Sequence, residues 1–223
     1  MNAEFVARME RILHLYLLPY DPAYPVVCFD ERPCFLIGDR MEPLAMQRGK
    51  VAKEHYSFDK NGSCALLAAI EPLTAQRLAQ VYSRRTKREY ALFMQSLADM
   101  YPQATKIRLV QDNLNTHSTA AFYEVFPAQQ AFELAQRFEF YFTPKSASWL
   151  NMIEIEFSAL SKQCLQRRIP TQTQLENQIL KLVKERSEKK IKIDWQFSVQ
   201  AARSKLNRHY VTLNQHNSEY LKT

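Results

Sequence analysis

Three acidic residues that are far apart in the chain each lie beside an element that could present them to a common site. Asp30 ends an apolar run at 26–29, Asp112 ends an alternating run at 106–111, and Glu154 lies in the first turns of a predicted helix. Residues just past the carboxyl ends of strands line the ligand crevice of an open α/β sheet. If the two runs are neighbouring strands, Asp30 and Asp112 emerge side by side, and Glu154 can close the third side.

Such a set of carboxylates predicts one kind of chemistry. Three carboxylates held close together repel one another, and their pKa values rise unless they share cations. Mg²⁺ prefers oxygen ligands, and two such ions about 3.5–4 Å apart can clamp the attacking and leaving oxygens of an in-line phosphoryl displacement. Taken alone, Glu154 is better explained as a solvated acid on an amphipathic helix. We assign no chemical role to Glu156, Asp39 or Asp59.

The composition is that of a basic globular chain. Its 223 residues, 46% of them hydrophobic, are enough for one domain with a sizeable core. The net charge of +7 suits a polyanion such as nucleic acid, although a merely basic soluble protein has the same balance. The sequence has no long apolar run and no signal-like N-terminus, so we expect no membrane partner. The four cysteines form no CxxC pair, which argues against a disulfide framework or zinc site and fits a reducing cytoplasm.

Hydrophobic periodicity predicts an α/β protein with a mixed central sheet. Three strands follow one another early in the chain, and strands then alternate with helices, so the sheet is expected to be flanked by helices. This is the element order of the ribonuclease H-like fold. The expected strands are 26–29, 34–37, 63–70, 106–111 and 138–142, and the expected helices are 4–17, 86–100, one from about 118, 150–166, 173–186 and 198–208.

Local signals give more detailed expectations around these elements. Pro33 separates the first two runs, which are therefore predicted to pair as a hairpin. Asn61-Gly62 predicts a second hairpin turn, and Ser146 and Ser148 are available to cap the helix that carries the acid of the third block. Three stretches are predicted to lack fully regular structure: 41–60, the loosely helical 127–137, and the tail at 211–223.

Three blocks of sequence around the acids resemble the signature motifs of one transposase family. They are Phe29-Asp-Glu31, Val110-Gln-Asp-Asn-Leu-Asn-Thr-His117 and Phe142-Thr-Pro-Lys-Ser-Ala-Ser-Trp-Leu-Asn-Met-Ile-Glu154, in the family's order. The family is the bacterial insertion-sequence group related to mariner elements, whose catalytic domains are DDE superfamily endonucleases. The similarity runs to about residue 210, so we divide the chain into a helix and connector at 1–25, a catalytic domain at 26–210 and a polar tail at 211–223.

The resemblance implies a metal-dependent transposase domain. Asp30, Asp112 and Glu154 would be the ligands of two Mg²⁺ ions, with Mn²⁺ able to substitute. Members of the family cleave DNA at the ends of their own element and join the freed 3′ ends to a target, typically TA. Because two ends react, a homodimer is expected by analogy.

Two departures from the family's pattern matter. The 41 residues between Asp112 and Glu154 are somewhat more than is usual in the group, and the stretch 127–137 is the natural place for the extra residues. Full-length members also carry an N-terminal helix-turn-helix region that reads the element's ends, and this chain lacks it. A separate helix-turn-helix chain is therefore an expected partner.

Two other interpretations remain open. The chain could be a catalytically incomplete transposase fragment that binds DNA or partner subunits, although the intact triad argues against decay. It could also be a different nuclease of the same fold, against which the Ala147-Ser-Trp-Leu-Asn151 block weighs.

Four residues within the blocks are predicted to support the triad. Glu31 is expected on the opposite side of its strand from the preceding aspartate, and a role beside the site is about as well supported as a purely structural one. Asn113 could hydrogen-bond near the metal site or cap the following helix, and the cap is the simpler role. His117 could orient the scissile phosphate or a water nucleophile, and Asn151 could hold the loop that presents the helical carboxylate.

Several basic and aromatic residues are candidates for contact with DNA. Those near the third block could meet phosphates or, for the tryptophan, stack on a base, and a basic run at 83–88 could contact the DNA backbone. A solvated position explains each charge about equally well, and a core or lid position is preferred for the tryptophan. The residues are Lys145, Trp149, Arg167, Arg168, Arg84 and Arg85.

Overall fold

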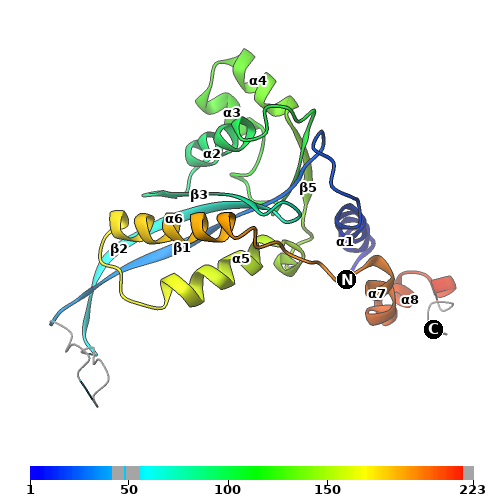
Figure 1. Ribbon diagram of the computed structural model, residues 1–223. Helices are drawn as coiled ribbons and strands as arrows, with labels where there is room; N and C mark the ends of the chain where they lie inside the picture. The colour runs from blue at the N-terminus through cyan, green and yellow to red at the C-terminus, as the bar shows by residue number, and fades with distance from the viewer. Residues whose placement is uncertain (42–47, 49–55, 218–223) are drawn as a thin grey trace.

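The computed structural model of the chain describes residues 1–41, 48 and 56–217, and within them lies a five-stranded mixed sheet (Figure 1). The strands are β1 (Val26–Asp39), β2 (Phe58–Glu71), β3 (Gln76–Tyr82), β4 (Ile107–Gln111) and β5 (Phe138–Phe142). Their order is β3-β2-β1-β4-β5. β1 pairs antiparallel with β2 and parallel with β4, which confirms the predicted mixed sheet and makes neighbours of the strands next to the two aspartates.

Helices cover both faces of the sheet because side chains along each strand alternate between the faces. Val27 and Phe29 point into one core and Cys28 into the other. Helices α2 (Lys87–Asp99), α3 (Ala120–Val125) and α4 (Ala128–Gln136) pack on the first face, and α5 (Ile153–Leu160) and α6 (Gln172–Glu188) pack on the second (Figure 1). The segment predicted as a loose helical insertion at 127–137 is thus mostly the regular helix α4.

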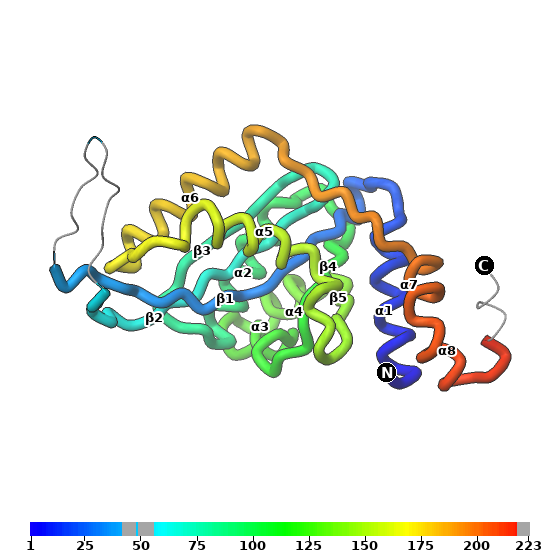
Figure 2. The backbone as a smooth tube through the Cα atoms, turned by 90° about the horizontal axis from the view of Figure 1, so that it is seen from below, coloured from blue at the N-terminus to red at the C-terminus, as the bar shows by residue number. Residues whose placement is uncertain are grey.

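A third, smaller core joins the N-terminal helix to the C-terminal helices at one end of the sheet (Figure 2). Met9 and Leu13 of the N-terminal helix are buried in it. The carboxylate of Glu10 accepts hydrogen bonds of 2.8 Å from both Nε and Nη2 of Arg203, and one of 2.6 Å from the hydroxyl of Tyr210. The three helices are α1 (Ala3–Tyr16), α7 (Val199–Lys205) and α8 (Asn207–Leu213).

The C-terminal part of the chain differs from its prediction. The single helix expected at 198–208 is divided between α7 and α8, because the backbone of Leu206 leaves the helical conformation (φ −107°, ψ 18°). The expected polar tail is helical as far as Leu213, since buried Tyr210 anchors this segment on α1. Residues 218–223 of that tail lie outside the described residues.

Strand β1 is continuous, so the hairpin predicted around Pro33 is wrong, and Asp30 lies within the strand rather than at its end. The pairing of β1 with β4 stops at Cys28, and beyond that point only β2 pairs with it. Proline has no N–H to donate and is tolerated where one edge of a strand is unpaired. Pro33 is therefore compatible with one long strand, although the sequence pattern predicted two strands separated by it.

Strands β2 and β3 also depart from expectation. The predicted turn at Asn61-Gly62 is instead a bulge inside β2. The register between β1 and β2 shifts opposite it, between Phe35 and Ile37, and Gly62 has a φ of 107°. β3 is absent from the predicted strands, although its buried residues alternate and Ala75 before it has a φ of 68°, as a turn requires. Most of the stretch expected to be irregular at 41–60 lies outside the described residues.

The helix predicted at 150–166 is divided into three parts. A 3-10 turn, η1 (Ser148–Leu150), precedes α5, and a π-helical turn, η2 (Ser161–Leu165), follows it. The predicted serine caps are wrong, because the N-cap residue of α5 is Met152 and no side chain caps it.

The four cysteines are free thiols, and all are buried. Burial raises the pKa of Cys28 to about 11, so this thiol is protonated and unreactive at neutral pH. None of the described helices combines the length and apolar character needed to cross a membrane.

Candidate active site

Asp30 and Asp112 come to the same end of the sheet because of the register between β1 and β4. The parallel pairing of these strands ends with Cys28 opposite Val110. Each aspartate lies two residues beyond that last pair, so the register places the two at the same level on neighbouring strands. Both line a cavity of about 400 Å³, hereafter the catalytic cavity.

The pKa of Asp30 reflects the charge at this end of the sheet. Burial raises the pKa of Asp30, and the carboxylates of Asp112 and Glu154 raise it further. The hydrogen bond from the N–H of Glu31 (2.7 Å) and the charge of His117 lower it. The resulting pKa is about 7. Both other acids are therefore close enough for their charges to act on Asp30. Within the described part of the chain, Asp30 belongs to no ion pair, and the charge of His117 is the one positive charge that acts on its pKa.

Glu154 lies in the first turn of α5, exposed to solvent and outside the lining of the catalytic cavity. Asn151 sets its position: Nδ2 donates a 2.8 Å hydrogen bond to the carbonyl of Phe29, next to Asp30, and the Asn151 carbonyl accepts from the N–H of Glu154 at 3.1 Å. The buried amide ties the start of α5 to β1. This is the geometry that the predicted supporting role of Asn151 requires.

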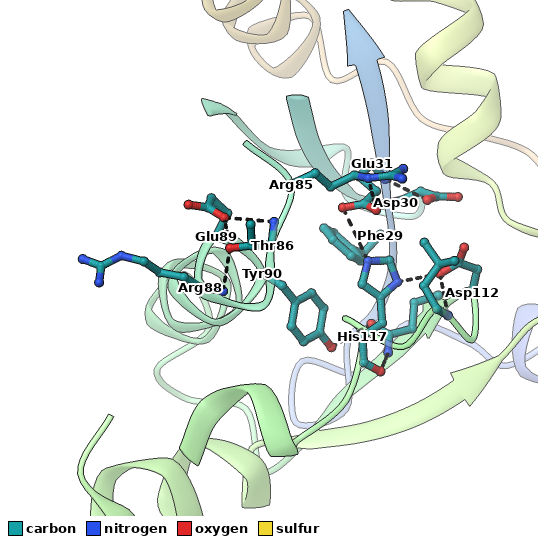
Figure 3. Close-up of polar contacts among 12 residues, drawn as sticks. Phe29, Asp30, Glu31, Arg85, Thr86, Arg88, Glu89, Tyr90, Asp112 and His117 are labelled. Atoms are coloured by element: carbon teal, nitrogen blue, oxygen red, sulfur yellow. Dashed lines mark hydrogen bonds and ion pairs between the residues drawn. The ribbon is translucent and has the colours of Figure 1, made fainter. Parts of the chain in front are cut away.

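His117 is buried and lies between two carboxylates. Its Nδ1 is 2.5 Å from Oδ1 of Asp112, and its Nε2 is 3.6 Å from Oε2 of Glu31 (Figure 3). Burial lowers its pKa, but the hydrogen bond with Asp112 and the interaction with Glu31 outweigh burial and raise the pKa to about 9. The ring is therefore an imidazolium at neutral pH. Only 1% of the surface of His117 is exposed, and its nearest polar contact is Asp112. The predicted role, to orient the scissile phosphate or a water nucleophile, stays a prediction.

The neighbours of His117 hold the ring in this orientation. It stacks on Tyr90, with centroids 4.9 Å apart, and meets Phe29 edge-on at 5.3 Å. Its carbonyl accepts a 3.1 Å hydrogen bond from Nε2 of Gln111, whose Oε1 accepts one of 2.9 Å from the Tyr90 hydroxyl. The imidazolium cannot turn away from Asp112 without disturbing the core beneath α2.

Glu31 extends this network of charges towards the surface. Its side chain is 3% exposed, and its Oε1 lies 3.1 Å from Nε of half-exposed Arg85. Arg85 immediately precedes the start of α2, where the N–H of Thr86 donates to the carboxylate of Glu89 at 2.9 Å in a capping box (Figure 3). A chain of alternating charges therefore leads from solvent through Glu31 and the imidazolium to Asp112.

We expect the metal-free protein to lose about 2 kcal/mol of stability between about pH 7.5 and 10 because of His117. Its folded-state pKa, about 9, lies above the ordinary value of 6.5, so its contribution is fully present below pH 6.5 and is lost as the pH rises through 9. Urea denaturation in EDTA at the two pH values measures the loss. The window lies above the pKa of Asp30, which is about 7.

The variant His117→Gln provides the control for this expectation. Over the same window its stability should vary less with pH than that of the wild type, because the titrating ring is gone. An equal pH dependence in the two proteins would mean that His117 is neutral in the folded state.

Glu156, two residues after Glu154, is a buried structural acid. Its carboxylate accepts hydrogen bonds from Nε and Nη2 of Arg77 at 3.0 and 3.2 Å, and from Nε and Nη2 of Arg186 at 2.8 and 3.0 Å. Burial raises its pKa, but the hydrogen bonds from Arg186 and Arg77 outweigh burial and lower the pKa below its usual value. Glu156 thus joins α5 to β3 and α6.

Two candidates for contact with DNA, Lys145 and Trp149, and the supporting residue Asn113 differ in their positions relative to the catalytic cavity. Lys145 is exposed and lines the catalytic cavity. Asn113 lines it as well and is not a helix cap, because α3 begins after Thr119. Trp149 is 44% exposed and packs edge-on against Phe197, with ring centroids 5.6 Å apart.

The four arginines that were candidates for DNA contact lie outside the catalytic cavity. Arg168 is paired with Asp39 at 2.8 Å, at the far end of β1 and about 30 Å along the strand from its other aspartate. Arg167 is exposed. Arg84 and Arg85 line a separate groove beside β2.

Two residues outside the predicted set shape the site. Arg8 of α1 lines the catalytic cavity. The hydroxyl of Tyr16, also on α1, donates a 2.7 Å hydrogen bond to the carbonyl of Leu150 and so holds η1 in place. No local signal marks either residue, because each is an ordinary member of an amphipathic helix and gains its position only from the tertiary packing.

The side chains gathered here fit divalent cations that prefer oxygen ligands. Asp30 and Asp112 present carboxylates to one cavity, and the pKa of Asp30 is raised first by burial and then by the charges of Asp112 and Glu154. Among the described residues, no three His, Cys, Asp or Glu side chains are gathered into a complete metal site. Glu154 is exposed and would have to turn towards the cavity to complete one.

Comparisons with known proteins agree with this architecture. In the solved structures, the chain is similar to the Mos1 strand transfer complex, with a TM-score of 0.51 and 14% identity over 84% of this chain and 59% of that chain. It is similar to a pre-cleavage Mos1 transpososome, with a TM-score of 0.50 and 13% identity over 86% of this chain and 63% of that one. The predicted ribonuclease H-like fold is confirmed, and the chain spans less than two-thirds of the length of these Mos1 chains. A search of curated proteins gave no match.

The family described as DDE superfamily endonuclease matches residues 25–176, more than half of the chain. The matched region contains all three acids of the predicted triad. Nucleases of this type use divalent metal ions, in agreement with the carboxylates at the end of β1 and β4. The chain therefore belongs to the DDE superfamily endonucleases.

Proposed function

We propose that this chain is the catalytic domain of a DNA transposase, which cleaves DNA strands at the ends of its element and transfers the 3′ ends to a target. The observation that carries the proposal is the pairing of Asp30 and Asp112 on one cavity, with the pKa of Asp30 raised by burial and by the neighbouring acids. Such a cavity binds cations and, through them, phosphate. The net charge of +7 suits a DNA substrate.

Each residue of the site has a task in this proposal. Asp30, Asp112 and Glu154 hold two divalent ions, Mg²⁺ or Mn²⁺. The bound ions would activate the attacking oxygen and neutralise charge on the leaving oxygen of the phosphodiester. His117 keeps Asp112 turned towards the cavity, and Asn151 keeps the start of α5 beside β1.

The proposed partners follow from the same function. DNA is the substrate, both as element end and as target, with TA as the proposed target sequence. Recognition of the element's ends is assigned to a helix-turn-helix chain or region outside the catalytic domain. Joining two ends in one reaction favours a homodimer.

Purified protein with Mg²⁺ or Mn²⁺ is expected to nick DNA, and EDTA or the substitution Asp30→Asn should abolish the nicking. The experiment follows the conversion of supercoiled to open circular plasmid, with the helix-turn-helix partner supplied. The matched control is Asp59→Asn, because Asp59 is an exposed acid of β2 with only a distant partner, Arg40 at 3.9 Å. The control should cleave like the wild type.

The alternative function, a transposase fragment that binds DNA without cutting it, makes the opposite prediction. It is favoured by the exposed position of Glu154 outside the catalytic cavity. If the wild type and Asp30→Asn both bind DNA but show no metal-dependent nicking, the enzymatic proposal is excluded and the binding function stands.

A further inference from the structure

A second cavity adjoins the catalytic cavity and shares a wall with it. The second cavity measures about 640 Å³ and is lined on one side by the first two turns of α1. The two cavities adjoin between α1 and the end of the sheet that carries Asp30 and Asp112, and together they are hereafter called the α1 groove. The residues that line both cavities are Arg8, Asn113, Pro144, Lys145 and Ser146.

Charge is distributed unevenly along the α1 groove. Asp30 and Asp112 lie at its inner end, where the proposed metal ions would bind. Arg8 and Lys145 lie where the two cavities meet, one on α1 and the other on the loop after β5. Glu4 lies on the outer part. Two cations are therefore placed just outside the acids, from two different elements.

We infer that Arg8 and Lys145 bind the phosphate backbone of the DNA strand immediately next to the scissile phosphate. This inference rests on the proposed function, because that function puts the scissile phosphate at Asp30 and Asp112. A strand that enters this site carries a negative charge at every nucleotide and must pass the junction of the two cavities. Guanidinium and ammonium groups are the side chains that make such backbone contacts.

The fold holds Arg8 firmly enough for this task. Two residues further along α1, Glu10 is bonded to Arg203 and Tyr210, and Tyr16 at the end of the helix is bonded to Leu150. The helix therefore has a fixed place relative to the loop that carries Lys145. Helices α1, α7 and α8 lie outside the matched region 25–176, so this contact adds to what the family match covers.

The present partner of Arg8 can be exchanged for phosphate. Nη2 of Arg8 lies 2.6 Å from the carboxylate of Glu4, one helical turn earlier, and the two side chains are 37% and 66% exposed. Ion pairs this open to solvent contribute little to stability. Glu4 therefore competes with DNA for Arg8, and its removal should strengthen the binding of DNA.

The test measures binding in the absence of metal ions, so that it does not depend on cleavage. Fluorescence anisotropy with a labelled DNA duplex, at a series of salt concentrations, gives Kd and its salt dependence for the full chain. Arg8→Ala should raise Kd about 5-fold to 10-fold and reduce the slope of log Kd against log salt by about 1. Glu4→Gln should lower Kd. If the Arg8–Glu4 pair were purely structural, Glu4→Gln and Arg8→Ala would change Kd in the same direction.

Arg11→Ala is the matched control for this test. Arg11 is on the same helix and is 59% exposed, but it faces Glu139 at 3.7 Å and the ring of Tyr141 at 4.3 Å rather than the groove. It should bind DNA like the wild type. Equal losses in Arg8→Ala and Arg11→Ala would reduce Arg8 to one of many surface charges and overturn the inference.

DNA with single uncharged methylphosphonates identifies the phosphate that is bound. At the contacted position, the modification should weaken the wild type but not weaken Arg8→Ala any further. If Arg8→Ala binds less tightly than the wild type by the same factor whichever phosphate is modified, the inference is wrong. Binding that behaves as expected without metal-dependent nicking would remove the proposed function and, with it, the position next to a scissile phosphate, but would leave Arg8 as a DNA-backbone contact. An absence of any DNA binding by the wild type would remove both the function and the contact.

Discussion

Replacing Asp112 with asparagine is expected to lower kcat/KM for DNA strand cleavage by about 10³-fold or more while the protein remains folded. Asp112 lines the catalytic cavity, and its Oδ1 also contacts Nδ1 of His117 at 2.5 Å. Asparagine retains an oxygen that can accept the hydrogen bond of the imidazolium. It loses the negative charge that a divalent cation requires, so the chemistry should fail while the contact with His117 survives.

Single-turnover cleavage of labelled DNA in Mg²⁺ measures this loss, and thermal unfolding supplies a second readout. Excess Mg²⁺ should raise the Tm of the wild type, because a ligand that binds only the folded state stabilises it. It should leave the Tm of Asp112→Asn almost unchanged. A variant that cleaves at more than about a tenth of the wild-type rate, or that still gains stability from Mg²⁺, would show that Asp112 is not a metal ligand.

The placement of Asp30 and Asp112 could be predicted from the sequence because it depends on local patterns. An apolar run before one aspartate and an alternating run before the other identify two strands, and parallel neighbours bring the residues after their last pair to one edge. The long β1 could not be predicted, because Pro33 reads as a break. Whether a proline interrupts a strand depends on which strands pair beside it, and that is decided by the whole sheet.

The sequence favoured Glu154 over Glu156, but it could not show which side chains each of the two acids contacts. The two acids are two residues apart on one short helix, so they point in different directions, and either could face a cleft. The partners of Glu156 are Arg77 and Arg186, which lie 79 and 30 residues away in the chain. Glu154 was favoured by its place in the first turns of the predicted helix, close to the loop, and by its place in the block that resembles the family.

The role of His117 and the groove beside α1 show the same limit. His117 stands in a recognisable block, but its burial comes from Tyr90 of α2 and Phe29 of β1, which no local pattern connects to it. Arg8 lies more than a hundred residues from Lys145, and the packing of α1 on Ala147, Leu150 and the C-terminal helices brings them to one groove.

The second large effect is expected from the buried acid: Glu156→Ala should cost about 3–5 kcal/mol of stability, because it leaves two buried arginines without their counter-charge. The side chains of Arg77 and Glu156 are 1% and 2% exposed, and that of Arg186 is 11% exposed. Water cannot replace the missing carboxylate at such depth. A loss of this size is about a fifth or more of the total stability of a typical domain.

Urea denaturation of Glu156→Ala and Glu154→Ala provides the matched comparison, because the two acids share one helix and one type of substitution. Glu154 is exposed in the first turn of α5, so its removal should cost less than about 1 kcal/mol, mainly through the helix dipole, yet it should abolish cleavage. Stability and activity should thus be lost in different variants. If Glu154→Ala unfolds the protein and Glu156→Ala leaves it stable but inactive, the roles of the two acids are exchanged, and the metal site lies on the other face of α5.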